Sequence, residues 1–314
     1  MRTPLRLRVG LAAAATLVVA CLVLPEVLPA PPANDPVRSA LLPPLTRVIS
    51  LTLLDGSTVT APDVARSIGE VVITERGRRR TIPLREVAAE RHFRFWLGSD
   101  RFGHDVLRQL LRGGRISLAI ATLGTLVALT MGGAVGAAAA TRGGLVDGAL
   151  MRLVDALLAF PVLFLMILAA ALFRPGPALL VAVLGLTSWM GLARLVRGQM
   201  LSLKTRPFVL AATAAGSRWH RIVALHYAPN LVGPVAQDTA LRMGDLVIAE
   251  ATLSFLGLGV PPSIPTWGAM VAEGQRVMLD GWWLAVLPGL AIAWLVIALA
   301  LIGDGLQQLG EPAA

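Results

Sequence analysis

Long runs of apolar residues, separated by short polar or basic segments, dominate the chain outside residues 31–110. A helix that crosses a bilayer needs about 20 mostly apolar residues. We therefore predict an all-α integral membrane protein with about six transmembrane helices. The expected spans are approximately Val9–Leu28, Ile116–Ala140, Leu150–Phe173, Ala178–Val196, Leu231–Leu256 and Trp282–Ile302.

Residues 31–95 follow a different pattern, in which apolar and polar positions alternate. The alternation surrounds Asp55-Gly56 and again Arg76-Gly77, and such turns between alternating runs favour β-hairpins. We expect a small β-rich insert on one face of the membrane. The run that follows, FGHDVLRQLLRGGR (Phe102–Arg115), is amphipathic, which predicts a segment lying along the membrane interface.

These patterns divide the chain into an N-terminal transmembrane helix (residues 1–30), an extracytoplasmic insert (31–95) and a helical core (96–314). Short loops rich in arginine and lysine stay in the cytoplasm. The loop 205–230 and its flanks are the most basic of the short loops, which predicts that both termini are cytoplasmic. The insert also contains many arginines, but loops longer than about 60 residues escape this rule.

Composition supports the membrane assignment. Of the 314 residues 55% are hydrophobic and only 15% are charged, and the mean hydropathy is +0.71. A net charge of +9 would suggest nucleic acid in a soluble protein, but here it fits basic loops that orient helices. We therefore expect the lipid bilayer, and no nucleic acid, as a partner.

The only cysteine, Cys21, excludes an internal disulfide bond. Val18-Val19-Ala20-Cys21 follows a basic start and an apolar run, which fits a bacterial lipoprotein cleavage site. Cleavage would leave a lipid on Cys21 and remove the first span. The residues after Cys21 remain apolar, which favours an uncleaved helix in which Cys21 packs against its neighbours.

No residue set indicates catalysis, a cofactor or a bound metal. The four histidines are scattered, without the spacing that would place two imidazoles together for zinc. Gly198–Thr205 is a near match to a phosphate-binding loop, but Leu203 stands where the second glycine is required. We expect a chain that is not an enzyme, so that any ATP hydrolysis must come from other chains.

A polar and basic stretch, Phe208–Asn230, lies between two apolar segments. Its closely spaced small residues, followed by a glycine turn and a proline, predict a short surface helix that another protein can approach closely. The candidate docking residues in the loop 205–230 are Leu210, Ala211, Ala212, Ala215, Gly216, Arg218, Arg221 and Pro229.

The fifth predicted span contains four charged residues, Asp238, Arg242, Asp245 and Glu250. A charge near the bilayer centre is unfavourable by about 2.5–3.5 kcal/mol on insertion scales. One interpretation is a polar lining of a translocation path, with Asp245 and Glu250 as lining residues. The other is a self-neutralised group that packs against a neighbouring helix, since the spacings place Arg242 near both aspartates.

Pro161 interrupts the third predicted span and can break or kink it. Helices interrupted by proline often line pathways, because the freed backbone groups need water or polar neighbours. Phe160 and Pro161 are therefore candidate lining residues; a proline simply tolerated in the helix is the alternative.

Five blocks in order resemble the permease subunits of binding-protein-dependent ABC importers of the dipeptide, oligopeptide and nickel group, most closely the second of the two permeases. The blocks are LGSDRFGHDVLRQLLRGGRISL (Leu97–Leu118), MRLVDALLAFPVL (Met151–Leu163), ARLVRGQMLSLK (Ala193–Lys204), EATLSFLGLGVPPSIPTWGAM (Glu250–Met270) and GDGLQQLGEP (Gly303–Pro312).

This resemblance implies a type I importer core in the bacterial inner membrane. The implied partners are a second permease in a heterodimer, two cytoplasmic ATPases and an extracytoplasmic binding protein that delivers short peptides, nickel or another small solute. Ala211, Ala212, Gly216 and Pro229 match the family's ATPase-docking loop. Leu210 departs from it, because the family usually has a glutamate there.

Two other functions are compatible with the residues. An ATP-independent secondary transporter or channel would act alone, although such transporters often show internal repeats and none is clear here. A membrane-anchored sensor that binds ligand through the insert is the second, but about six spans exceed what an anchor needs. ATP dependence of uptake separates the importer from the secondary transporter, and deletion of the insert separates it from the sensor.

Overall fold

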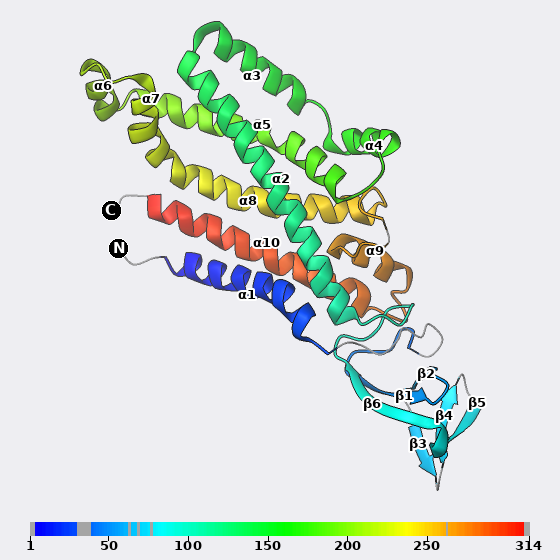
Figure 1. Cartoon of the computed structure of the whole chain (residues 1–314). Helices are drawn as coiled ribbons and strands as arrows, with labels where there is room; N and C mark the ends of the chain where they lie inside the picture. Colours follow the sequence, from blue (N-terminus) through cyan, green and yellow to red (C-terminus); the bar gives the residue numbers. More distant parts are fainter. Residues whose placement is uncertain are drawn as a thin grey trace. The chain divides into compact units, whose positions relative to one another are not determined.

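The computed structural model describes residues 4–29, 39–61, 64–67, 70–75, 78–261 and 263–310. The chain forms two compact units (Figure 1). The first comprises residues 1–18, 116–264 and 291–314, and the second comprises residues 19–115 and 265–290.

Helices make up most of the described chain, as predicted. They are α1 (Leu5–Val27), α2 (Val106–Arg142), α3 (Gly144–Leu158), α4 (Val162–Leu172), α5 (Pro177–Lys204), α6 (Pro207–Ala214), α7 (Trp219–Ile222), α8 (Ala228–Phe255), α9 (Trp267–Arg276) and α10 (Trp283–Gly310). Among the described residues four helices, α1, α2, α5 and α10, are long and apolar enough to cross a membrane. Helix α8 has the length of a span, 28 residues, but carries the four charged residues noted above.

The third expected span, Leu150–Phe173, is not one helix. Helix α3 ends at Leu158 and α4 begins at Val162, with Pro161 in an extended conformation between them (φ −65°, ψ 127°). Proline has no N–H to continue a helix and disfavours helical geometry in the residue before it. The third expected span is therefore two helices, because the proline breaks it, which is one of the two effects expected of Pro161.

The amphipathic run Phe102–Arg115 does not form a helix of its own. From Val106 onward its residues belong to α2. Helix α2 is continuous over 37 residues from Val106, which corresponds to a length of about 55 Å. The hydrocarbon core of a bilayer is only about 30 Å thick. One helix therefore contains both the amphipathic run and the second expected span.

Glycines let helices of the first unit approach closely. A Cβ atom on Gly132 would lie 2.6 Å from the carbonyl oxygen of Trp189, and one on Gly136 would lie 2.5 Å from that of Ala193. Both contacts join α2 to α5, as expected of small residues at this spacing. Helix α1 meets α10 in the same way, since a Cβ on Gly10 would lie 2.8 Å from the carbonyl oxygen of Ala298.

The second unit contains two three-stranded sheets, of order β2-β1-β6 and β3-β4-β5. The strands are β1 (Thr46–Leu53), β2 (Thr58–Ala61), β3 (Val64–Ser67), β4 (Glu70–Glu75), β5 (Arg78–Pro83) and β6 (Val87–Phe95). Both predicted hairpins are confirmed, because β1 pairs antiparallel with β2 and β4 with β5. Gly56 has φ +81° in the first turn, while Arg76 and Gly77 lie outside the described residues.

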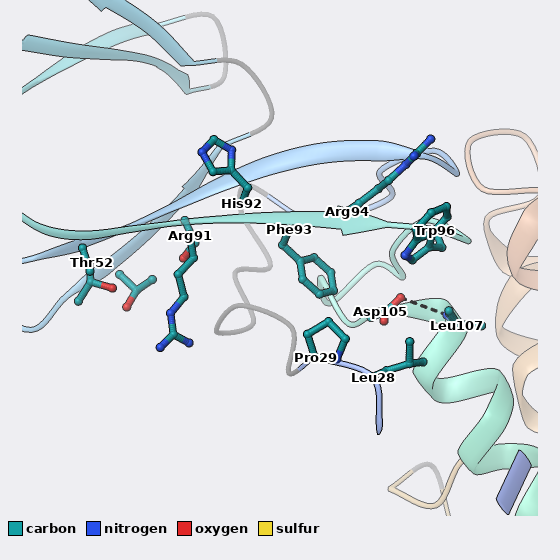
Figure 2. A pocket seen from close by; sticks show the side chains of 13 residues that line it. Leu28, Pro29, Thr52, Arg91, His92, Phe93, Arg94, Trp96, Asp105 and Leu107 are labelled. Atoms are coloured by element: carbon teal, nitrogen blue, oxygen red, sulfur yellow. Dashed lines mark hydrogen bonds between the residues drawn. The ribbon is translucent and has the colours of Figure 1, made fainter. Parts of the chain in front are cut away.

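The sheet β2-β1-β6 has two unlike faces. Leu51, Leu53 and Val59 belong to an apolar core that also contains Val71 and Ile73 of the other sheet. The opposite face carries hydroxyl and arginine side chains and borders a cavity (Figure 2). One face therefore stabilises the unit, and the other is open to a ligand.

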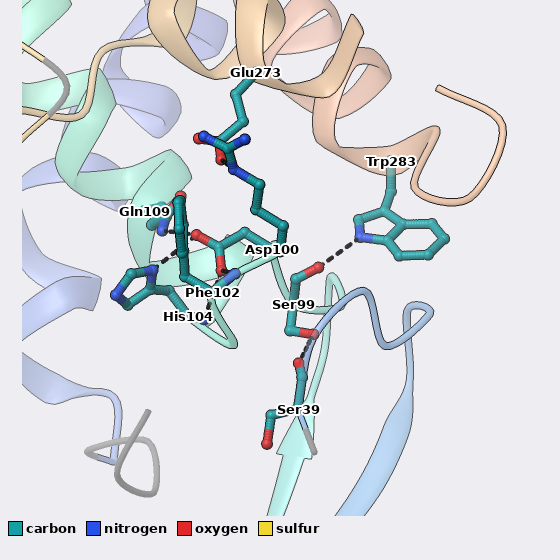
Figure 3. A network of polar contacts seen from close by, with 9 residues as sticks. Ser39, Ser99, Asp100, Phe102, His104, Gln109, Glu273 and Trp283 are labelled. Atoms are coloured by element: carbon teal, nitrogen blue, oxygen red, sulfur yellow. Dashed lines mark hydrogen bonds and ion pairs between the residues drawn. The ribbon is translucent and has the colours of Figure 1, made fainter. Parts of the chain in front are cut away.

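A polar network organises the turn before α2 (Figure 3). The buried carboxylate of Asp100 accepts hydrogen bonds from the backbone N–H groups of Phe102 and His104, both at 2.8 Å. Its other oxygen lies 2.8 Å from His104 Nδ1 and accepts from Gln109 Nε2 at 2.7 Å. Arg101 also pairs with Glu273 of α9, at 2.8 Å. The hydrogen bonds of Asp100 hold the turn that precedes α2 in place. A hydrophobicity pattern does not reveal such polar contacts.

Candidate functional site

The predicted surface helix in the basic loop is present as α6. Pro207 stands at its first position, where the missing N–H removes no helical hydrogen bond. At the other end Gly216 has φ +74°. The N–H of Ser217 donates to Ala212 O at 3.1 Å, and that of Gly216 donates to Thr213 O at 3.0 Å. This is the Schellman arrangement, which satisfies the last carbonyls of a helix and favours glycine at the left-handed position.

The loop is anchored by its apolar side chains. Val209 of α6, Ile222 of α7 and Tyr227 are buried in a cluster with residues from the ends of α2 and α5. Those residues are Ala140, Leu192, Val196 and Met200. A π-helical turn, Val223–Tyr227, joins α7 to α8. The loop is therefore packed onto α2 and α5 and is continuous with α8.

The opposite side of the loop is exposed. Ala211 and Ala215 are exposed, and Leu210 keeps 55% of its surface accessible. Ala212 is only half-buried and packs toward the anchoring cluster. The predicted small-residue positions thus divide between an outward face and the packed face.

Basic and aromatic side chains continue the exposed face into α7. Arg218 and Arg221 are exposed, and neither forms a salt bridge within the described part of the chain. Trp219 between them keeps 68% of its surface accessible. Pro229, also exposed, lies in the first turn of α8. We call Leu210, Ala211, Ala215, Arg218, Trp219 and Arg221 the loop surface.

In α8 the charges do not form the trio that the spacing allowed. Nη2 of Arg242 lies 2.8 Å from Oδ2 of Asp238, and Nε of Arg242 lies 3.0 Å from the same oxygen. Nη1 of Arg242 donates to the carbonyl oxygen of Ser188 in α5 at 2.8 Å. Arg242 thus neutralises one aspartate and joins two helices.

Asp245 is exposed, and none of the described residues pairs with it. It shares one side of α8 with four other exposed residues, spaced alternately four and three apart as on a single helix face. These are Leu241, Ile248, Thr252 and Phe255. A carboxylate on such a face requires water or a partner of opposite charge when the helix lies in a membrane.

Glu250 is fully buried. Its carboxylate accepts hydrogen bonds from Ser117 Oγ in α2 at 2.9 Å and from Ser254 Oγ in α8 at 2.8 Å. Burial and these bonds indicate that Glu250 joins two helices here, whereas Asp245 faces outward. The sequence pattern treated the two acids alike because it could not show which side of α8 each occupies.

Two salt bridges between α3 and α5 went unrecognised in the sequence. Arg197 binds Asp147 through Nε and Nη2, and Arg194 binds Asp155. The hydrogen bond from Arg197 holds the pKa of Asp147 below its usual value. Arg152, three residues before Asp155 in the same helix, is exposed. Tertiary contact between helices decided this pairing, which local spacing cannot show.

Phe160 and Pro161, the other candidate lining residues, are both exposed at the break between α3 and α4. Phe160 keeps 61% of its surface accessible. Their lining role stays a prediction. The candidate residues thus lie at three places within the first unit: the loop surface, the outward side of α8 and the break between α3 and α4.

The chain is similar in sequence to a known family of membrane proteins. Residues 128–314 match the family described as "Binding-protein-dependent transport system inner membrane component". The chain is 35% identical to the dipeptide transport system permease protein DppC of Bacillus subtilis, over 69% of this chain and 68% of the relative. It is 37% identical to the glutathione transport system permease protein GsiD of Pectobacterium atrosepticum, over 69% and 72%.

A solved structure titled as an inward facing conformation of the MetNI methionine ABC transporter shares the fold. The TM-score is 0.54 at 18% identity, and the match covers 65% of this chain and 96% of the other. At this identity the match bears on the helical architecture alone.

Proposed function

Because this chain belongs to the binding-protein-dependent transport system inner membrane components, it is a permease subunit of an ATP-driven importer, and we propose that it carries short peptides as half of a heterodimeric pathway. Such a system works with ATPase subunits and a substrate-binding protein. A second permease would complete the pathway, and two ATPases would act from the cytoplasm. We place both termini in the cytoplasm and residues 31–95 outside, as the basic short loops suggest.

The observation that carries the proposal is the two-sided build of the loop. Its outer side offers small and apolar groups, Ala211, Ala215 and Leu210, at which another protein can approach closely. Its inner side is packed against the ends of α2 and α5 through Val209 and Ile222. A push on the outer side would therefore be transmitted to long helices, which is what an ATPase must achieve in a transporter.

The partner surface should match the chemistry of the loop surface. Leu210 takes the place of an acidic residue, so we propose that an apolar pocket of the ATPase receives it. Arg218 and Arg221 would face acidic groups at the rim of that pocket, because opposite charges across an interface steer and align partners. The exposed indole of Trp219 suits such an interface, where tryptophan often contributes strongly to binding.

We further propose that Asp245 borders the translocation pathway. It is the exposed acid of α8, whereas Asp238 is neutralised and Glu250 is buried among hydroxyl groups. A carboxylate there would attract the amino end of a peptide. The relatives named for dipeptide and glutathione transport favour a peptide cargo. Phe160 and Pro161 are proposed as further lining residues.

The test is co-purification of the tagged chain from its native cells in mild detergent, with loop variants. Ala211→Arg adds a charge to the loop surface without changing the backbone, and Gly216→Arg adds one at a left-handed position. Gly56→Arg is the matched control, because Gly56 also has a left-handed conformation (φ +81°) with open space around it but lies in the hairpin of the insert.

We expect the wild type and Gly56→Arg to retain a second permease and ATPases. Both loop variants should retain the second permease and lose the ATPases by about 10-fold or more, since an unpaired charge in a packed interface is unfavourable by about 1.5–3 kcal/mol. Recovery of ATPases with both loop variants would refute docking at this surface. Absence of any ATPase from intact wild-type chain would favour a transporter that acts alone.

A further inference from the structure

A cavity of about 800 Å³ lies within the second unit, whereas the loop surface and Asp245 belong to the first. Sheet residues form one wall, and residues directly after α1 and at the start of α2 form the other. Figure 2 shows Phe93 pointing from β6 toward Pro29, with Arg91 on the same side of the strand. Nothing in the proposed transport mechanism uses this cavity.

The sheet wall offers hydroxyl groups and a cation. Ser50, Thr52 and Thr58 line the cavity, and Ser50 is the register neighbour of Arg91. Paired residues of neighbouring strands lie on the same face of a sheet. In the other neighbouring strand, β2, Thr60 pairs with Ser50. Thr60 is buried, and its hydroxyl has no hydrogen-bond partner among the described residues. This face of the sheet is therefore rich in hydroxyl groups, which can donate hydrogen bonds to a ligand in the cavity.

Arg91 is the cation on the cavity side of β6, because Figure 2 shows Arg94 on the opposite side of that strand. Arg91 forms no salt bridge within the described residues. The guanidinium of Arg94 lies 4.5 Å from the ring centre of Trp96, and its buried Nε has no hydrogen-bond partner among those residues. Asp105 is the acid of the lining, and it accepts a hydrogen bond from the N–H of Leu107 at 3.2 Å. The charge of Arg91, which lies beside hydroxyl groups and has no acid partner within the described residues, favours an anionic ligand.

The chain places the cavity at the edge of a membrane. Leu28 and Pro29 directly follow α1, and Asp105 directly precedes α2, and both helices qualify as membrane spans. Trp96, half exposed, is the type of residue that concentrates at the membrane–water interface. Leu24 and Val27 of α1 are also exposed. A ligand at this level would meet acyl chains on one side and water on the other.

We propose that this cavity binds the headgroup of an anionic phospholipid. Arg91 would contact the phosphate, with the hydroxyls of the sheet wall completing its hydrogen bonds, and the acyl chains would follow the exposed apolar side of α1. Arginine binds phosphate through paired N–H groups, which suits a phosphodiester. A headgroup of net negative charge would neutralise Arg91, which is unpaired within the described part of the chain, whereas a zwitterionic headgroup carries a cation of its own.

The test is native mass spectrometry of the complete transporter after incubation with equal amounts of phosphatidylglycerol and phosphatidylcholine. We expect the wild type to retain phosphatidylglycerol preferentially. Arg91→Gln should lower its affinity by about 10-fold or more, as loss of a charge-assisted hydrogen bond predicts. Arg91→Lys keeps the charge and should retain part of the preference. Arg85→Gln removes the same charge outside the cavity and should bind like the wild type.

Equal retention of phosphatidylglycerol by Arg91→Gln and the wild type would overturn the proposal, and so would equal retention of the two lipids by the wild type. A separate arm measures thermal stability with inorganic phosphate. Stabilisation by millimolar phosphate that requires Arg91, without lipid retention, would identify a free anion as the ligand and refute the lipid. Because Arg91 is exposed, its variants should fold, which gel filtration of the complex verifies.

Discussion

Arg242 and Asp238 form a salt bridge along one side of α8, with Nη2 and Oδ2 2.8 Å apart, and the same guanidinium reaches the backbone of Ser188 in α5. This pair leaves the third charge, Asp245, exposed. The pair therefore belongs to the structure of the helix bundle, and Asp245 is available for function.

The two aspartates should respond differently to neutralisation. Asp238→Ala leaves Arg242 without its acid, which should lower stability by about 1.5–3 kcal/mol and reduce the yield of assembled transporter. Asp245→Asn should leave assembly intact and slow peptide uptake. The measurements are thermal unfolding in detergent and uptake by proteoliposomes. Normal uptake kinetics in Asp245→Asn would refute the proposal that Asp245 borders the translocation pathway.

Leu210 offers a test of partner chemistry. Leu210→Glu places the usual acidic residue of the family on the loop surface, where we expect an apolar pocket in the ATPase. Binding of this protein's own ATPase should weaken by about 10-fold or more, because a carboxylate would be buried without a partner. Leu210→Met keeps size and apolarity and is the control. Tighter binding of Leu210→Glu would show that the pocket is basic.

Two glycines of α2 should tolerate alanine very differently. A Cβ on Gly114 would lie 2.5 Å from Sγ of Cys21 and 2.8 Å from the ring of Trp267, whereas one on Gly133 meets nothing within 4 Å. Gly114→Ala should destabilise the protein by about 1–3 kcal/mol through overpacking. Gly133→Ala should be neutral or stabilising by up to about 1 kcal/mol, since alanine favours helix. Equal thermal midpoints for both variants would contradict the close packing at Gly114.

Asp105 predicts a dependence of stability on pH. Burial raises its pKa to about 6, although the hydrogen bond from Leu107 and the charge of Arg108 act in the opposite direction. The unfolded value is about 3.9. Because the folded pKa is higher, the protonated acid favours the folded state. That stability is fully present below about pH 4 and is lost as the pH rises through about 6.

The measurement is the thermal midpoint of the wild type and of Asp105→Asn from pH 4 to 7.5. The wild type should lose about 2–3 kcal/mol relative to the variant over this range, since one pKa unit corresponds to about 1.4 kcal/mol. Asp280→Asn, at an exposed site of the same unit, controls for the loss of one charge. Parallel pH curves for wild type and Asp105→Asn would rule out the effect of burial.

Features set by local chemistry were readable from the sequence. The Asp55-Gly56 hairpin formed because its turn and its alternating strands agree, and the basic loop formed a helix that ends at Gly216. Features set by contact between distant segments were not readable. Asp155 pairs with Arg194 of another helix, and Asp100 gathers donors that no hydrophobic period marks. The orientation of Asp245 and Glu250 depends on which neighbours surround α8.

The π-helical turn Val223–Tyr227 sets the direction in which the loop faces. A π turn arises where one residue is inserted into an α-helix, and each residue of an α-helix rotates the chain by about 100°. Deleting a single residue there would restore a regular helix only by rotating α6 and α7 around the axis of α8 by about that angle, which would withdraw Val209 and Ile222 from the cluster that anchors the loop. The direction of the loop surface is thus a matter of helical phase, and the π turn matches that phase to the anchoring cluster.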